Sequence, residues 1–230
     1  MARIILIETS ASLCSVALSE DGRTVFSKES QEGRSHASLT APFIKEAIDS
    51  QGIRIKDCGA VCVSSGPGSY TGLRVGVSTA KGLCFGAGIP LLAAPTLDII
   101  VHGAIARGLV PEGCTTIVPM LDARRMEVYT ADYSTEGRRL TEVVPKVVDG
   151  NTFSDALVAG KVLFTGDGAM KCQSTISSEN AVFAPLVPKA EDMAEIAEQA
   201  YNEKRFEDVA YFEPFYLKDF IATVSRKKLF

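Results

Sequence analysis

Hydrophobic residues recur at two different spacings over the first half of the chain, and each spacing predicts its own kind of element. Residues 3–8 form a short apolar run, residues 14–22 alternate like a half-buried strand ending in Glu-Asp-Gly, and residues 23–30 continue as a third strand. Two further apolar runs, residues 59–68 and 89–95, are the expected fourth and fifth strands. The first three strands should form a meander.

Helical spacing separates the later strands. Residues 35–52 carry an amphipathic repeat in which Pro42 is expected to kink or restart the helix, and residues 70–85 and 96–108 predict two more helices. Three meandering strands followed by helix, strand, helix and strand are typical of a ribonuclease-H-like mixed sheet.

After Pro111 the same pattern begins again. Residues 115–137 repeat the form of residues 3–22, because in each segment an apolar strand ends in a carboxylate (Asp122 or Glu8), turns, and returns as an alternating strand. Self-similarity on this scale indicates two related structural units.

The fold predicted from this duplication is α/β, with two ribonuclease-H-like lobes of the kind found in actin and sugar kinases. We expect an N-terminal lobe at residues 1–108 and a C-terminal lobe at residues 109–230. Apolar residues make up 46% of the chain, which is ample for two cores.

Charge and composition narrow the function classes. The formal net charge is −4, whereas a protein that grips nucleic acid by itself normally shows a basic face. No apolar run approaches the ~20 residues needed to span a bilayer, and the N-terminus reads as a core strand and not as a signal peptide. The six cysteines include no CxxC pair, so we expect reduced thiols and a cytoplasmic protein.

The stretch Val63–Leu83 contains five glycines at the transition from a strand to a helix, which is the usual anatomy of a phosphate cradle. It matches neither the P-loop pattern nor the dinucleotide fingerprint, since Gly66–Gly72 is one residue too long for G-x-G-x-x-G. An anion nest of backbone amides at Gly66–Gly68 stays open.

The helix that follows has one face almost without side chains. Gly72, Gly76, Ala80 and Cys84 recur at four-residue spacing, and each interior glycine costs about 1 kcal/mol of helix stability relative to alanine. Close approach of another backbone would compensate for that loss. The bare face is expected to lie either against this protein's own sheet or against a helix of another chain.

Four segments of this chain are distinctive: "ILIETS" from Ile5, "SSGPGSYTGLRVGVSTAKGL" from Ser64, "GIPLLAAPTLD" ending at Asp98, and "EPFYLKDF" from Glu213. Together they resemble the TsaB (formerly YeaZ) family. The resemblance implies an actin-like fold and a non-catalytic paralogue of TsaD. It further implies a role in making threonylcarbamoyladenosine on tRNA, in which a TsaD-like catalytic subunit and a TsaE-like ATPase are the partners.

The family pairs through its first two helices, which here are residues 35–50 and 70–85. On that basis the glycines are expected to shape a docking surface. The implied partner-interface residues are His36, Leu39, Phe43, Tyr70, Gly72, Leu73, Arg74, Gly76, Val77 and Ala80. The resemblance also implies a homodimer when the chain is alone, indirect contact with tRNA, and no cofactor on this chain, with ATP and metal held by the partner subunits.

The metal-binding histidines of the catalytic relative are missing. Their positions fall at about Thr96 and Ile100, and His102 has only Asp98 four residues away, so a solvated or capping His–Asp pair is expected and no metal site. Ser12 and Leu13 stand where the relative has acidic residues. The residues considered for a nucleotide or anion loop are Glu8, Thr9, Ser10, Gly66, Gly68 and Asp122. The alternative role of Glu8 and Asp122 is to cap the turns that follow them.

Two other functions are alternatives to the scaffold interpretation. A phosphotransferase of the sugar-kinase kind would need carboxylates after Glu8, and a metallopeptidase would need the absent histidine pair. Arg74 is either an interface residue, facing a carboxylate or RNA, or a plain solvated arginine. Arg124-Arg125 and residues 225–228 favour a solvated turn and a frayed end over contact with tRNA.

Overall fold

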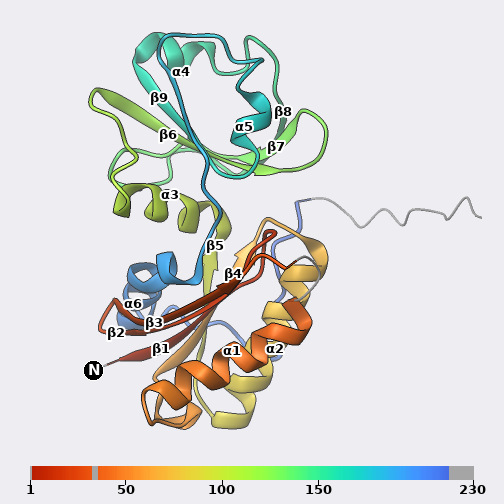
Figure 1. Ribbon diagram of the computed structural model, residues 1–230, viewed down its shortest axis with the longest axis vertical. Coiled ribbons are helices and arrows are strands. Elements are labelled where there is room, and N and C mark those ends of the chain that lie inside the picture. The colour runs from red at the N-terminus through yellow and green to blue at the C-terminus, as the bar shows by residue number, and fades with distance from the viewer. Residues whose placement is uncertain (1, 33–35, 218–230) are drawn as a thin grey trace, which may run out of the picture.

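The computed structural model describes residues 2–32 and 36–217, which form two lobes, one above the other (Figure 1). Each lobe contains a five-stranded mixed sheet, with strand order β3-β2-β1-β4-β5 in the first and β10-β9-β6-β7-β8 in the second. Read backwards, the second order becomes β8-β7-β6-β9-β10, which is the order of the first sheet displaced by five strands. The predicted duplication of a ribonuclease-H-like sheet, and with it the two-lobed actin-like fold class, is therefore confirmed.

The first sheet follows the predicted meander. Its strands are β1 (Arg3–Glu8), β2 (Cys14–Glu20), β3 (Arg23–Ser30), β4 (Ala60–Gly66) and β5 (Leu91–Pro95). Central strand β1 pairs antiparallel with β2 and parallel with β4, so that Leu6 lies between Ala17 and Cys62. Because both faces of β1 are covered, its apolar residues form an unbroken run and do not alternate with polar ones.

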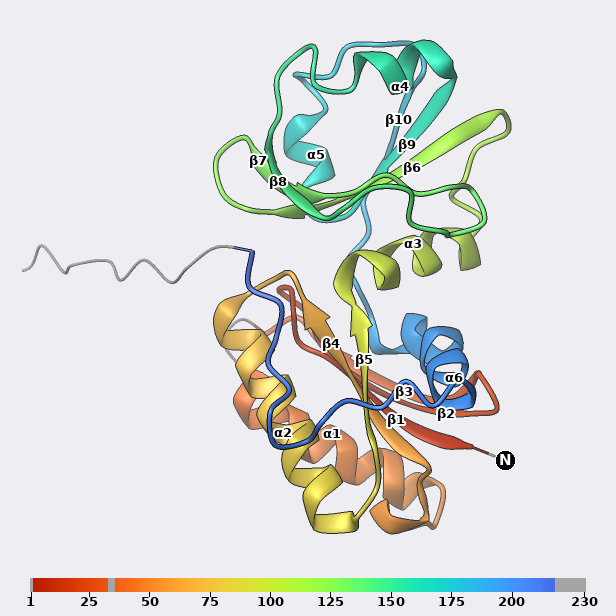
Figure 2. The ribbon, with the colours of Figure 1, turned by 180° about the vertical axis from the view of Figure 1, so that it is seen from behind.

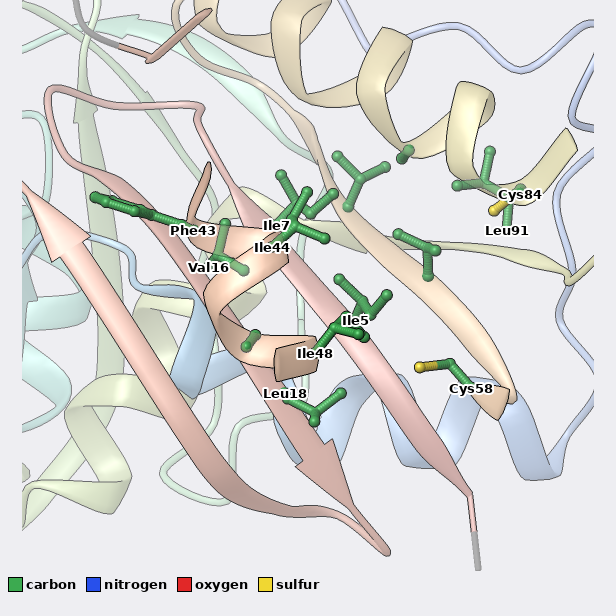
Figure 3. Close-up of a cluster of buried hydrophobic side chains, with 14 of the residues drawn as sticks. Ile5, Ile7, Val16, Leu18, Phe43, Ile44, Ile48, Cys58, Cys84 and Leu91 are labelled. Carbon is green, nitrogen blue, oxygen red and sulfur yellow. The ribbon is translucent and has the colours of Figure 1, made fainter. Parts of the chain in front are cut away.

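Helices α1 (His36–Ser50) and α2 (Tyr70–Ala87) cover one face of this sheet, and the short η1 (Ile55–Asp57) follows α1. Figure 3 shows the core that they enclose, where Phe43, Ile44 and Ile48 of α1 meet Ile5 of β1 and Val16 of β2. Helix α1 is assigned as one continuous helix through the exposed Pro42. The predicted restart at this proline does not occur.

The second lobe is built on shorter helices. Its strands are β6 (Cys114–Asp122), β7 (Glu127–Thr130), β8 (Val144–Val147), β9 (Lys161–Thr165) and β10 (Ala181–Ala184). Helices α4 (Ser154–Ala159) and α5 (Ala169–Cys172) stand where the first lobe has its two long helices. The long helix pair is therefore a feature of the first lobe.

The two cores exchange helices. Helix α3 (Thr96–Ala106) follows β5 but packs Leu97, Ile100 and Val101 against the second sheet. In return η2 (Ala190–Met193) and α6 (Ala194–Asn202) come back to the first lobe (Figure 1) and pack on the other face of its sheet, in one core cluster with Ile4 and Leu6. The predicted boundary after residue 108 stays a prediction. Because each core takes up helices from the other side of that boundary, the two lobes are held together.

Polar contacts reinforce this junction. The Arg107 guanidinium, at the end of α3, lies 2.7 Å from Asp192 Oδ1 and 2.9 Å from Glu191 Oε1, both in η2. The Asp192 side chain is 5% exposed, so Arg107 neutralises a nearly buried carboxylate. A Cβ on Gly103 would lie 2.7 Å from Asp192 Oδ2, and the pair thus depends on a glycine in the facing helix.

Two properties of the chain as a whole are plain. All six cysteines are free, as predicted, and all but Cys114 are buried. Within residues 2–32 and 36–217, no helix is both long enough and apolar enough to cross a membrane.

Replacing Arg107 with alanine tests the junction. The change leaves Asp192 nearly buried without its cation, and the free energy of unfolding should fall by about 1–3 kcal/mol. Urea denaturation measures this loss. The matched control is Arg205→Ala, which removes an exposed ion pair to Glu203 and should cost less than ~1 kcal/mol. Equal losses in the two variants would contradict the junction's role.

Candidate functional site

The glycine stretch lies where α2 starts, directly beside the loop that follows β1. Ser69 caps the helix, because its Oγ accepts a hydrogen bond from Gly72 N at 3.2 Å, and Ser69 N donates to Ser10 O at 2.7 Å. Thr9 Oγ1 donates to Gly72 O at 2.8 Å. These bonds join the loop at residues 9–10 to the first turn of α2.

The glycines allow this close approach. A Cβ on Gly72 would lie 2.0 Å from Thr9 O, and one on Gly76 would lie 2.3 Å from Thr9 Oγ1. A Cβ on Gly68 would lie 2.4 Å from Ser10 O. No side chain fits at such distances, so the bare face of α2 is turned toward the protein's own sheet.

This placement corrects the expectation that the glycine stripe forms the docking surface. Five of the predicted interface residues are buried within the chain, namely Gly72, Leu73, Gly76, Val77 and Ala80. Phe43 is likewise buried in the core under α1. The four-residue spacing does mark a site of close backbone approach, as predicted, but the approaching backbone belongs to this chain.

Glu8 is fully buried at the end of β1. Its Oε1 accepts a hydrogen bond from Ser10 N at 2.5 Å, whereas Oε2 has no hydrogen-bond partner among the described residues. Burial raises the pKa of the Glu8 carboxyl to about 7, against the opposing effect of the hydrogen bonds from Ser10 and Ser64. The carboxyl caps the turn that follows it and faces no solvent.

Asp122 performs the same capping role at the end of β6. Its Oδ1 accepts from Arg124 N at 2.7 Å and from Lys171 Nζ at 2.5 Å. Partial burial raises the pKa of Asp122, but the hydrogen bonds from Lys171 and Arg124 outweigh it and hold the pKa below its usual range. Glu8 and Asp122 thus act in separate lobes, and no hydrogen bond between them appears among the described contacts.

The second lobe also repeats the close approach of a neighbouring backbone to a pair of glycines. Gly166 and Gly168 lie at the end of β9 as Gly66 and Gly68 lie at the end of β4, and a Cβ on Gly166 would lie 2.2 Å from Met120 O. Of the six residues considered for a nucleotide or anion loop, the structure therefore gathers Glu8, Thr9, Ser10, Gly66 and Gly68 in the first lobe and leaves Asp122 in the equivalent loop of the second.

Asp98 and His102 do not pair with each other. Tyr133 OH donates a hydrogen bond to Asp98 Oδ1, and His102 Nδ1 lies 3.9 Å from Glu195 Oε2. The expected His–Asp pair is therefore wrong, because partners brought in by the tertiary fold occupy both side chains. In the described part of the chain, no three His, Cys, Asp or Glu side chains are gathered to hold a metal ion.

The outer sides of α1 and α2 carry the residues that face solvent. On α2 these are Thr71, Arg74, Ser78, Gly82, Phe85 and Gly86, and Phe85 is 87% exposed. A Cβ on Gly82 would meet nothing within 4 Å. Of the predicted interface residues, Arg74 is exposed, and His36, Leu39 and Tyr70 are partly exposed.

Sequence reasoning missed Ser78, Gly82 and Phe85. A second small-residue spacing at Ser78, Gly82 and Gly86 was available as a signal, offset by two residues from the buried glycine stripe. The two stripes differ only in which one faces the sheet.

A C-terminal strap, residues 207–217, borders this surface. Figure 2 shows it after α6, crossing the first lobe and rising alongside α2. Glu207 N donates to Leu91 O at 2.9 Å, Lys81 Nζ to Ala210 O at 2.9 Å, and Phe215 N to Ser65 O at 2.7 Å. The family-like segment that starts at Glu213 lies in the strap as far as residue 217, and its last three residues lie outside the described ones.

Two glycine variants separate the two faces of α2. Gly76→Ala places a methyl group against Thr9 and should lower the free energy of unfolding by about 1–3 kcal/mol. Gly82→Ala fills open space and should raise it by up to ~1 kcal/mol through helix propensity. Urea titrations of both variants check this, and a stable Gly76→Ala protein would contradict the internal packing.

Glu8 should give the protein a pH-dependent stability. The folded-state pKa is above that of an unfolded glutamate, so its contribution is complete below about pH 4.5 and is lost as pH rises through 7. The loss is on the order of 3 kcal/mol. Relative to the wild type, Glu8→Gln should therefore gain stability between pH 5 and about 8, measured as the difference between their urea-unfolding free energies. Parallel pH profiles would count against a buried, proton-binding Glu8.

Comparisons with known proteins agree with the resemblance in the sequence. Residues 27–225 match the family described as TsaD: tRNA N6-adenosine threonylcarbamoyltransferase. The chain is 31% identical over 230 residues to the tRNA threonylcarbamoyladenosine biosynthesis protein TsaB of Escherichia coli strain K12, covering 96% of each protein. It is 27% identical to the TsaB protein of Haemophilus influenzae, covering 98% of this chain and 96% of that one.

A solved structure extends the likeness to three dimensions. YeaZ from Pseudomonas aeruginosa matches 94% of this chain and 100% of its own, with a TM-score of 0.80 and 26% identity. The glycine motif, the duplicated sheet and near-complete coverage of these relatives lead to one conclusion: the chain belongs to the TsaB (YeaZ) family, within the wider TsaD-related family.

Proposed function

We propose that this chain is a non-catalytic, activating subunit in the synthesis of threonylcarbamoyladenosine on tRNA, and that it pairs with a TsaD-like catalytic subunit through the outer sides of α1 and α2. A TsaE-like ATPase is the further partner, tRNA is contacted indirectly, and the work is cytoplasmic. The similarity to TsaB proteins of two bacteria supports this process. The observation that carries the docking role is the exposed, small-residue side of α2, which ends in Phe85.

The state of the acidic residues supports a non-catalytic role. A kinase-like site needs carboxylates open to magnesium and phosphate. Glu8 is buried under its own turn, and Asp122 is paired with Lys171. The positions of the relative's histidines, Thr96 and Ile100, lie buried in α3. Both alternatives, a phosphotransferase and a metallopeptidase, therefore have less support than a scaffold.

The outer side of α2 suits a helix of another chain. Ser78 and Gly82 form a strip of small residues along the outer side of the helix. Close packing of two helices needs small residues at the contact. Phe85 at its end supplies a large apolar side chain of the kind that dominates binding energy. In the absence of the TsaD-like subunit, a second copy of this chain is expected to cover the same surface as a homodimer.

The docking surface is tested with Gly82→Leu. The variant should fold without strain, since a Cβ at position 82 meets nothing within 4 Å. The leucine side chain should nevertheless keep a partner helix from packing closely against the small residues of α2. Isothermal titration calorimetry with the TsaD-like subunit of the same organism should show an affinity weaker than that of the wild type by about tenfold or more. A tenfold loss corresponds to ~1.4 kcal/mol of binding free energy. Ala159→Leu on α4, an exposed position of the other lobe, is the control and should bind like the wild type. Unchanged binding by Gly82→Leu would place the interface elsewhere.

The non-catalytic role is tested on the purified chain alone. It should not hydrolyse ATP, and a turnover of about 1 s⁻¹ or more would overturn the proposal in favour of a phosphotransferase.

A further inference from the structure

Three side chains stack at the start of α2. The Arg74 guanidinium lies 4.1 Å from the centre of the Tyr70 ring, and the Tyr70 ring lies 4.9 Å from that of Tyr216. A guanidinium over an aromatic ring is held by cation–π attraction. The stack therefore fixes an exposed arginine at one place on the outer side of α2.

The strap keeps Tyr216 in this position. Phe215 N donates to Ser65 O, and a Cβ on Gly66 would lie 2.6 Å from Phe215 O, so the strap is seated directly on the glycine turn. About two helical turns after Arg74, Lys81 holds the strap through the carbonyl oxygens of Ala210 and Phe212. Residue 216 thus reaches α2 from more than a hundred positions away in the sequence.

The charge of α2 is opposite to that of the chain. Its two charged residues, Arg74 and Lys81, are both basic, although the whole chain carries −4. Lys81 is occupied by the strap. Among the described residues Arg74 has no carboxylate partner and is accompanied on the outer side of α2 by neutral side chains such as Thr71 and Ser78.

We propose that Arg74, positioned by Tyr70 and by Tyr216 of the strap, receives a carboxylate from a helix of the partner protein and makes α2 select an acidic partner over a second copy of this chain. This inference rests on the proposed function. A second copy would bring another α2 with basic and no acidic residues, which adds like charge. The exposed carboxylates of its α1, Glu46 and Asp49, are already paired with Lys28 and Lys45.

The stack explains why this contact should be strong for a surface charge. Guanidinium and carboxylate form two parallel hydrogen bonds in a fixed plane, and an arginine that is already oriented loses less conformational freedom when it binds. RNA is the weaker candidate, because binding phosphate backbones takes several neutralising cations, and the outer side of α2 offers one.

The experiment compares affinity for the TsaD-like subunit with self-association. Titration calorimetry at low salt should show about tenfold weaker pairing for Arg74→Gln. Arg74→Lys should rescue only part of the loss, since an ammonium cannot form the planar pair. Sedimentation equilibrium should show a homodimer of Arg74→Gln that is unchanged or tighter. Lys161→Gln removes an exposed cation of β9 in the other lobe, and it should match the wild type in both measurements.

The strap is tested by Tyr216→Ala and Tyr216→Phe. The alanine variant should weaken pairing with the TsaD-like subunit about threefold or more by releasing Tyr70 and Arg74, whereas the phenylalanine variant keeps the ring and should bind normally. Equal weakening by both would overturn the role of the stack.

The outcomes separate this inference from the proposed function. If Gly82→Leu weakens pairing but Arg74→Gln does not, the docking surface stands and the carboxylate contact is overturned. If Arg74→Gln instead weakens binding of tRNA by the assembled complex and leaves the affinity for the TsaD-like subunit unchanged, the guanidinium serves RNA and the inference is overturned. Equal loss of homodimer and heterodimer would overturn the selectivity.

Discussion

The contact between α2 and the loop after β1 is the constraint on which the first lobe depends. Thr9 donates its hydroxyl proton to Gly72 O, and the helix approaches so closely that positions 72 and 76 admit no side chain. The same contact orients α2 about its axis. With the glycine stripe held against the sheet, Ser78, Gly82 and Phe85 are left on the opposite side. An internal packing requirement thereby decides which residues a partner can meet.

The two lobes share the same kind of turn after their first strands, and in both lobes the turn is held by a carboxylate. Each carries a carboxylate that accepts the amide two residues later, Glu8 from Ser10 and Asp122 from Arg124, with paired glycines beneath the turn. In the first lobe the acid is desolvated, and in the second it is neutralised by Lys171. Acids held in this way stabilise loops, and they are poorly placed to organise a metal and phosphates.

The chain returns to its first lobe after the second lobe is complete, and this return connects the two lobes. Helix α6 covers the face of the first sheet opposite α1 and α2, and the strap then passes around β5 to the start of α2. At the junction, Arg107 pairs with Glu191 and Asp192 and fastens the helix of one core to the other. The surface proposed for docking is consequently made from the beginning of the chain and from its last described residues.

Hydrophobic spacing alone determined the meander, the three helices of the first half and the duplication, because burial on one face imposes a periodicity that is local in the sequence. The family followed from a short glycine motif for a related reason, since few residue combinations allow backbones to meet so closely. The direction in which α2 presents its two small stripes was settled only by tertiary structure: both have four-residue spacing, and only the distance to Thr9 distinguishes them. The pairing of Asp98 with Tyr133, of Arg107 with Asp192 and of Tyr70 with Tyr216 also could not be predicted, because each joins segments at least 35 residues apart.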